Sequence, residues 1–519
     1  MTDEAPKKRR GRDERMAERR QAAQPVVWKG MAGGQFAPLA AADIPKIQGA
    51  ALKVLEITGI ADVEAAYLPM FLQAGCWVND RGRLCFPAAL VNELIAATPK
   101  SVTVHGLAPG AAVSFAPGRV HVCTGGTGVT MFEAGKVRDS TLADLYDVTR
   151  LADAMENLHC CNRQLVARDV EDVAIMDVNT AYAIASGTGK PIGAGVTTPQ
   201  SAHEVRRLMD VILGDPTAFD HAPVCWSGGT FVVSPLKAPA DGQEKLEAIV
   251  RAGFPVHQVM VPQSGTTGPA PLAGTLAQAL AESLFVLCFV QLLRRGHPFI
   301  IGCWPFVSDL RTGAFSGGSG EQALLMAASA QVLNAYGLPS SIAAGMCDAK
   351  LTDVQAGAEK ALTLSLATLS GASLIYSFAG MLGSIMGISP AQMVIDNELL
   401  GASLRVLRGI EVDDDTLALP VIDEAAVDPG HYIAHPQTLA MMESEYLYPA
   451  LADRSSLSQW LSKPGPDMAA RAEAEAARLL ASHFPTHIAE ETDAAIRAAF
   501  DIRLPRARMR PVQAANQVA

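Results

Sequence analysis

The chain lacks an excess of positive charge. Its 519 residues include 42 Lys and Arg against 53 Asp and Glu, which gives a formal net charge of −11 at pH 7. Nucleic-acid-binding proteins need clustered basic side chains to contact phosphates, so we expect no nucleic-acid partner. The one basic run, residues 7–10 within "PKKRRGRDERMAERR", is followed by interleaved acidic residues. It predicts a solvated tail or a docking helix.

Paired cysteine motifs are also absent. There are nine cysteines, an odd number, and no CxxC pair, so we expect reduced thiols packed as small apolar residues. His159, Cys160 and Cys161 are adjacent and suggest a zinc site. Neighbours on a strand point to opposite faces, however, so both thiols reach one metal only at a bulge, and we predict no metal site.

Long apolar runs free of polar groups are missing as well. The most apolar stretch, residues 276–296, contains Glu282 and Gln291 at helical spacing, which favours a buried helix over a membrane span. No apolar segment of the secretory type follows the basic run. We expect a cytoplasmic protein with no membrane partner.

What the chain does contain is a repeated unit of an apolar strand, a polar or Gly-rich corner and an amphipathic helix. The predicted strands lie within residues 119–126, 157–169, 190–196, 222–232, 254–265, 297–309, 340–350 and 372–382. About eight such units predict an α/β fold that closes as a (β/α)₈ TIM barrel. The rival is a doubly wound open sheet, which usually carries GxGxxG after its first strand. Here "GGTGVTMF" leads to a predicted hairpin instead.

Other segments surround this predicted barrel. We divide the chain into a basic, flexible tail (1–30), an N-terminal helical cap with a small hairpin (31–118), the barrel (119–412) and a C-terminal helical extension (413–519). The extension should wrap the barrel or join protomers, and we expect a homo-oligomer.

Barrel enzymes place their functional groups after the strands. The candidates at these positions are Thr124 to Thr127, Arg163, Arg168, Asp169, Trp226, Phe231, Gln263 to Thr267, Trp304, Phe306, Ser308, Asp309, Arg311, Met346, Asp348, Lys350, Tyr376, Phe378 and Met381. Aromatic faces near a carboxylate suit a quaternary or tertiary ammonium ion. Two alternatives stay open: each Trp is a core residue, and each of Asp309 and Asp348 forms a structural ion pair with its neighbouring cation.

A run of five small residues separates the sixth strand from its helix: Ser316, Gly317, Gly318, Ser319 and Gly320. Small residues let a large flat ligand or a partner approach the backbone closely, and a plain flexible loop is the alternative. Glu321, which follows, is either functional or a complement to the helix dipole.

Several segments together resemble the trimethylamine methyltransferase family of corrinoid-dependent methyltransferases. They include "GCWPFVSDLRTGAFSGGSGEQALLMAASAQ", "GLPSSIAAGMCDAKLTDVQAGAEKAL", "GMLGSIMGISPAQMVIDNELLG", "RVHVCTGGTGVTMF" and "GHYIAHPQTLAMMESEYLYPALADRSSLSQW". The resemblance extends from roughly residue 30 to residue 500. It implies a TIM barrel that moves a methyl group from a methylated amine to cob(I)alamin on a separate small corrinoid-binding protein. No DxHxxG cobalamin motif is present, so the cobalamin would be presented in trans and none would be tightly bound.

Family members that demethylate trimethylamine carry pyrrolysine, whereas this chain has only standard residues. The resemblance therefore implies a quaternary donor such as glycine betaine, proline betaine or carnitine. We predict that Asp309, Glu321 and Asp348 are catalytic. Substrate binding is assigned to Trp226, Phe231, Trp304, Lys350, Tyr376 and Arg168, and corrinoid approach to Ser316, Gly317, Gly318, Ser319 and Gly320.

Other functions stay open at this point. One is methyl transfer from trimethylamine or another donor to a corrinoid or to tetrahydrofolate. Another, from a different class, is a non-catalytic barrel that binds a betaine and regulates a partner.

Overall fold

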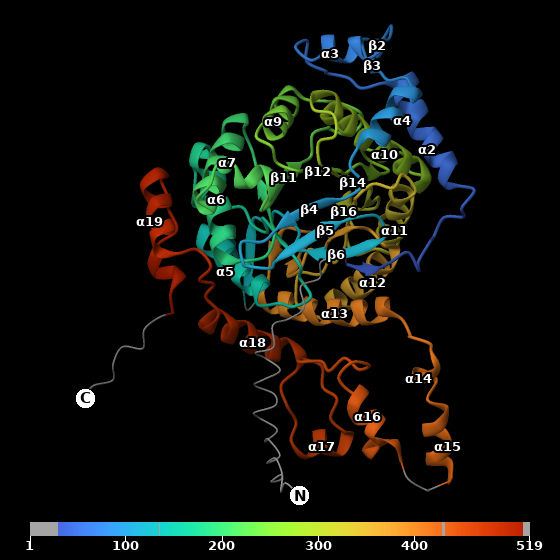
Figure 1. The fold of residues 1–519 in the computed structure, drawn as a ribbon, viewed down its shortest axis with the longest axis vertical. Helices are drawn as coiled ribbons and strands as arrows, with labels where there is room; N and C mark the ends of the chain where they lie inside the picture. Colours follow the sequence, from blue (N-terminus) through green and yellow to red (C-terminus); the bar gives the residue numbers. More distant parts are fainter. Residues whose placement is uncertain (1–29, 134, 428–430, 512–519) are drawn as a thin grey trace, which may run out of the picture.

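The computed structural model describes residues 30–133, 135–427 and 431–511. Its centre is a closed barrel of eight parallel strands (Figure 1). The strands are β6 (Arg119–Cys123), β9 (Cys161–Asn162), β10 (Ile192–Gly195), β11 (Cys225–Gly229), β12 (Val256–Met260), β14 (Phe299–Cys303), β17 (Ser340–Ala343) and β18 (Leu374–Tyr376). The ring closes where Tyr376 pairs with Cys123 and where Cys123 bridges in parallel to Cys160, beside β9. The predicted (β/α)₈ fold is confirmed, and each strand lies inside its predicted range.

A helix follows every strand, as a parallel barrel requires. They are α5 (Leu142–Asp153), α6 (Val173–Gly187), α7 (Pro199–Leu213), α9 (Ala240–Arg251), α10 (Leu272–Leu293), α11 (Gly320–Asn334), α12 (Val354–Ser370) and α13 (Pro390–Arg408), with a short α8 (Ala218–His221) before β11. Many begin at a capping side chain. Thr141, for example, accepts a hydrogen bond from the Asp144 backbone in a capping box, which satisfies a free N–H of the first turn.

The N-terminal cap explains why α10 is apolar on every side. The cap contains α2 (Ile44–Lys53), a short π-helix (Val54–Thr58), α3 (Leu68–Gln73), a hairpin of β2 (Trp77–Val78) and β3 (Leu84–Cys85), and α4 (Ala88–Ala97). Both α2 and α4 pack on the outer face of α10, while β12 and β14 cover its inner face. As a result, 89% of the most apolar 18-residue stretch of α10 is buried, as the sequence predicts for a core helix.

A second hairpin, which was not predicted from the sequence, closes the end of the barrel where the parallel strands begin. It consists of β4 (Val102–His105) and β5 (Ala112–Phe115), and its His105 N–H donates to the Pro223 carbonyl just before β11. The Phe115 ring meets Trp226 edge-on at 5.8 Å between centroids. A short β1 (Met31–Ala32) pairs antiparallel with the start of β6. Substrates must therefore enter from the opposite end.

Small sheets surround that open end. One joins β7 (Thr130–Glu133) and β8 (Lys136–Asp139), the predicted hairpin, to β19 (Met381–Leu382) and β20 (Gly387–Ile388). The other contains β13 (Gln263–Ser264), β15 (Phe306–Asp309) and β16 (Ala314–Phe315). Both sheets grow from loops that follow barrel strands, so they wall the mouth of the barrel.

The C-terminal extension has two parts (Figure 1). Helix α18 (Met468–Ser482) packs on α13 and α5, α19 (Glu490–Ala499) packs on α7, and a 3₁₀ turn (Arg506–Met509) follows. In the chain between α13 and α18, an arm projects away from the barrel (Figure 1). It is formed by α14 (Asp414–Leu417), α15 (Leu419–Val427), a 3₁₀ turn (Tyr432–Ala434), α16 (Pro436–Met441) and α17 (Leu457–Ser462). No described residue of these arm helices is buried. The predicted basic run at residues 7–10 lies outside the described residues.

Candidate active site

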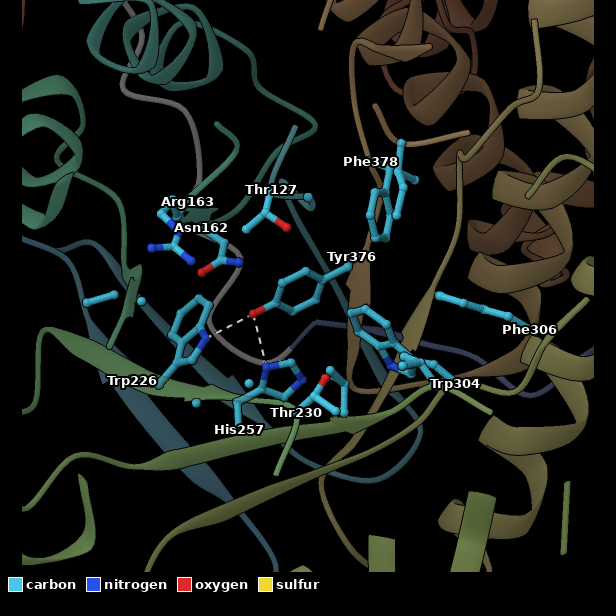
Figure 2. Close-up of a pocket in the computed structure, with 18 residues that line it drawn as sticks. Thr127, Asn162, Arg163, Trp226, Thr230, His257, Trp304, Phe306, Tyr376 and Phe378 are labelled. Atoms are coloured by element: carbon cyan, nitrogen blue, oxygen red, sulfur yellow. Dashed lines mark hydrogen bonds between the residues drawn. The ribbon is translucent and has the colours of Figure 1, made fainter. Parts of the chain in front are cut away.

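A cavity of about 390 Å³ occupies the carboxyl-terminal end of the barrel (Figure 2). Every barrel strand except β17, or the loop after it, contributes to its wall. The lining residues are Gly126, Thr127, Asn162, Arg163, Ala194, Gly195, Trp226, Gly228, Gly229, Thr230, His257, Val259, Val261, Trp304, Phe306, Tyr376, Phe378 and Ile385. Thr127 and Thr230 are exposed to solvent, so the cavity opens between the loops after β6 and β11. Its size and position are those of a small-molecule site.

Aromatic side chains dominate the cavity. The Trp304 ring lies 5.2 Å from Tyr376 and 6.1 Å from Phe378 between centroids, and its plane is tilted by 60° and 69° to theirs. Phe306 stands beside Trp304 at 6.5 Å. Rings that meet at such angles present several faces to one space, which is the arrangement that attracts a cation without hydrogen-bond donors.

A hydrogen-bond network locks these rings in place. The Trp226 Nε1–H donates to the Tyr376 hydroxyl oxygen at 3.0 Å, and that hydroxyl lies 3.1 Å from His257 Nδ1. His257 Nε2 lies 2.8 Å from the Ser341 hydroxyl, and Trp304 Nε1–H donates to the Ser341 carbonyl at 3.0 Å. An indole N–H can only donate, so we assign the tyrosine proton to the bond with Nδ1 and the histidine proton to Nε2.

The network is not set up for acid–base chemistry. Burial lowers the pKa of His257 to about 3, so the imidazole stays neutral, and burial raises the pKa of Tyr376 well above its ordinary value. Each polar atom that joins these rings already has a partner. These groups hold the cavity's shape and are not available to move protons at neutral pH.

A buried ion pair supports the loop that carries Phe378. Lys360 Nζ lies 2.8 Å from Asp396 Oδ2 and donates to the carbonyls of Gly345 and Phe378, and the Gly380 N–H donates to the same carboxylate. Both ionic side chains are almost completely buried. Phe378 has a φ of +41°, which is unfavourable for a residue other than glycine. The ion pair therefore holds a strained loop with its ring at the cavity.

Three of the predicted substrate-binding residues lie together in this cavity: Trp226, Trp304 and Tyr376. Phe231 is buried beside it, 5.7 Å beneath the Lys245 ammonium group, and is not a lining residue. Lys350 is exposed and donates to the carbonyl of Asp348. Arg168 is exposed and forms an ion pair with Asp139. Neither cation lines the cavity.

The predicted catalytic carboxylates lie outside the cavity wall. Asp309 pairs with Arg311 at 2.6 Å, and this guanidinium lowers the Asp309 pKa to about 2. Glu321 is exposed in the first turn of α11. Asp348 accepts hydrogen bonds from the Ser384 and Ser316 hydroxyls and from the Gly317 N–H. The catalytic roles of all three carboxylates stay predictions. The contacts of Asp309 and Asp348 already give these two side chains a structural role.

The run of small residues also has an internal explanation. A Cβ atom at Gly317 would lie 2.8 Å from the Met346 Cβ, and one at Gly318 would lie 2.3 Å from the Glu359 carboxylate. Ser319 caps α11 by accepting from the Gln322 N–H. Close packing within the chain therefore explains Gly317 and Gly318, whereas a Cβ atom at Gly320 would meet no neighbour. Corrinoid contact at Ser316, Gly317, Gly318, Ser319 and Gly320 stays a prediction.

His257 and Asn162 also line the cavity, and neither was among the predicted site residues. The predicted residues lie mainly after the strands, whereas these two side chains come from within β12 and β9. A usable signal was present, because a polar side chain in a barrel strand either faces the interior or breaks the apolar outer pattern.

The described residues contain no group of three His, Cys, Asp or Glu side chains that could hold a metal ion. All nine cysteines are buried and free. At the zinc candidate, burial raises the pKa of the Cys161 thiol to about 12, which favours the protonated thiol.

A family model described as trimethylamine methyltransferase (MTTB) matches residues 8–506. Trimethylamine methyltransferase MttB of Desulfitobacterium hafniense (strain DSM 10664 / DCB-2) is 30% identical over 87% of this chain and 91% of its own length. Glycine betaine methyltransferase of Desulfitobacterium hafniense (strain Y51) is 29% identical over 88% of this chain and 94% of its own. The crystal structure of the Methanosarcina barkeri monomethylamine methyltransferase has a TM-score of 0.46 at 13% identity, covering 87% of this chain and 96% of that one.

Proposed function

Because this chain belongs to the trimethylamine methyltransferase family, and is therefore a methyltransferase, we propose that it transfers a methyl group from a quaternary amine to cob(I)alamin on a separate corrinoid protein. The supporting observation is the cavity at the barrel mouth, which has an aromatic wall and no acidic side chain among its lining residues. The cobalamin is a co-substrate in this scheme.

The donor's charge state supports a quaternary amine. A quaternary nitrogen is permanently cationic and has no N–H to donate, so ring faces such as those of Trp304 and Tyr376 are suitable partners. A protonated tertiary amine carries an N–H that needs an acceptor, and no carboxylate lines this cavity. We therefore favour glycine betaine, proline betaine or carnitine over trimethylamine.

The reaction needs alignment more than proton transfer. The cobalt electron pair forms the new bond to the methyl carbon, the N–CH₃ bond breaks, and its electron pair stays on nitrogen as a neutral tertiary amine. Cobalt changes formally from Co(I) to Co(III), and no proton moves. The locked rings around His257 can hold nitrogen, methyl and cobalt in line and exclude water, which suits a cavity with no free acid or base.

The corrinoid protein would cover the open mouth of the barrel, between the loops near Thr127 and Thr230, and the run Ser316–Gly320 is a candidate contact.

A second copy of the chain would cover the projecting arm. There, Val427, Ile433 and Leu457 are 82, 73 and 72% exposed, and so much exposed apolar surface is typical of a permanent interface. We expect a cytoplasmic homo-oligomer, which sedimentation velocity tests.

The test is spectroscopic. Purified protein is mixed with reduced cob(I)alamin and, separately, with glycine betaine, proline betaine, carnitine or trimethylamine, and formation of methylcob(III)alamin is followed. We expect a signal with one quaternary amine and none with trimethylamine. A signal only with trimethylamine would overturn the donor assignment. Tight betaine binding without transfer, even with the corrinoid partner or tetrahydrofolate present, would instead favour a non-catalytic binding protein.

A further inference from the structure

We propose that Arg163, with Asn162 beside it, forms a carboxylate-binding site inside the cavity, so that the methyl donor is a zwitterion with a carboxylate. This inference rests on the proposed function and narrows its substrate class. Arg163 is the only residue with a permanently charged side chain among the lining residues. Lys350 and Arg168, which were predicted from the sequence to bind substrate, lie outside the cavity.

The Arg163 guanidinium is fixed but not fully used. Its Nη1 lies 3.6 Å from Asp177 Oδ1, a charge contact that is too long for a hydrogen bond. Its buried Nε has no hydrogen-bond partner among the described residues, and the same is true of Asp177 Oδ1. Unpaired buried donors are rare in folded proteins because each loses its contact with water. The guanidinium therefore has donors free for a ligand.

The surroundings hold Arg163 in this position. A Cβ atom at Gly195 would lie 2.7 Å from the guanidinium carbon, so the group lies flat against that glycine. Asp177 is itself anchored, because its Oδ2 accepts from both the N–H and the hydroxyl of Thr197. A planar guanidinium held in this way is preorganised to bind a carboxylate through two parallel hydrogen bonds.

The two ends of the cavity match the two ends of a betaine. Figure 2 shows Arg163 and Asn162 on one side of the Tyr376 ring and Trp304 with Phe306 on the other. The Asn162 amide lines the same end of the cavity as Arg163 and adds a donor there. A betaine would place its carboxylate there and its methylated nitrogen among the rings.

The proposal predicts strong rejection of quaternary amines that lack a carboxylate. Choline has a trimethylammonium group and a hydroxyl, so it would occupy the aromatic end while leaving the Arg163 donors desolvated and unpaired. Sites built to hydrogen-bond a substrate group discriminate strongly against analogues without it. We expect the wild-type protein to bind its betaine about 100-fold more tightly than choline.

Calorimetric titration of the full-length protein without corrinoid tests this directly. The ligands are glycine betaine, proline betaine, carnitine and choline, and the variants are Arg163→Gln, Arg163→Lys, Arg168→Gln and Gly195→Ala. Arg163→Gln should weaken betaine binding about 100-fold and leave choline binding unchanged. Arg163→Lys should lose less betaine affinity than Arg163→Gln, because lysine keeps the positive charge. Gly195→Ala should also weaken betaine binding, since its methyl group displaces an intact guanidinium. Arg251→Gln, at an exposed ion pair with Glu247, is the matched control.

The outcomes separate this inference from the proposed function. Equal betaine affinity in wild type and Arg163→Gln would overturn Arg163 as the carboxylate anchor, meaning the side chain that binds the substrate carboxylate, and would leave the proposed function standing. A loss of betaine affinity confined to Arg168→Gln would place the carboxylate anchor at the rim of the barrel and also overturn the proposal. No binding of any quaternary amine by folded wild-type protein would reject the proposed function itself. If Arg163→Gln fails to fold, equal wild-type affinities for betaine and choline would still reject the anchor.

Discussion

Tyr376 and His257 stack with ring centroids 4.9 Å apart, and the tyrosine hydroxyl lies 3.1 Å from His257 Nδ1. This pair links strands β18 and β12 across the barrel interior. It also binds the two tryptophans, since Trp226 donates to the same hydroxyl and Trp304 shares Ser341 with His257. The pair therefore fixes the aromatic wall before any substrate enters, which is the preorganisation that an alignment reaction needs.

The first prediction concerns acid stability. The folded pKa of His257 is about 3, against about 6.5 in an unfolded chain, so only the unfolded chain takes up the proton between these values. Stability due to His257 is complete above about pH 6.5 and falls by about 1.4 kcal/mol per pH unit below it. Denaturant unfolding at pH 7.5, 6 and 5 should show His257→Gln approaching the wild type as pH falls.

The control is His203→Gln, on the exposed face of α7. Its stability curve should run parallel to that of the wild type, because the exposed His203 side chain is not part of the buried network. If the His257→Gln curve also runs parallel, His257 is not held neutral in the folded protein.

The second prediction concerns the cation site. Trp304→Leu removes a ring face while keeping an apolar side chain, and a desolvated cation–π contact is worth about 1 to 2 kcal/mol. Betaine affinity measured by calorimetry should fall about 10-fold or more. Trp77→Leu, in the cap hairpin and 39% exposed, should bind as the wild type does. Unchanged affinity in Trp304→Leu would place the ammonium group elsewhere.

The third prediction concerns the buried pair of Lys360 and Asp396. Lys360→Met leaves the carboxylate buried without its cation, which should cost about 3 to 5 kcal/mol. The double variant Lys360→Met/Asp396→Leu should recover much of that stability, but not betaine affinity, because the Phe378 loop has lost its support. Thermal unfolding and calorimetry measure the two effects. A double variant as unstable as the single one would contradict this account.

The fourth prediction tests the role of Asp348. Asp348→Ala removes the acceptor used by Ser316, Gly317 and Ser384, so we expect a lower thermal midpoint with unchanged betaine affinity. The measurements are thermal unfolding, betaine titration and methyl transfer on the same preparation. Loss of methyl transfer at unchanged stability would instead assign Asp348 the catalytic role predicted from the sequence.

The barrel could be predicted from the sequence because its signal is local. Each strand is a short β-branched or apolar run, and each helix has its own amphipathic pattern and caps, as at Thr141. The hairpin of β4 and β5 was missed, although the buried Val102 and Val104 alternate with the exposed Thr103. Two four-residue strands are a weaker pattern than a 15-residue helix.

The site was only partly predictable, because spatial proximity decided it. Position at or after the end of a strand indicated Trp304 and Tyr376, which line the cavity, but it indicated Asp348 and Arg168 equally. These two side chains instead contact neighbouring segments, Asp348 at Ser384 and Arg168 at Asp139. Which rim residues face inward depends on loops that fold back, such as the pairing of β15 with β16. No spacing in the sequence shows that Arg163 would be left with free donors.

A single-turnover mass balance follows both products of the proposed methyl transfer. The protein, its corrinoid partner with cobalamin reduced to Co(I), and glycine betaine carrying ¹³C-methyl groups on nitrogen are mixed, and both products are quantified by mass spectrometry. We expect one labelled methylcobalamin for each dimethylated tertiary amine formed, with the same stoichiometry for whichever betaine binds. Demethylated amine without labelled methylcobalamin, or transfer from trimethylamine alone, would contradict it.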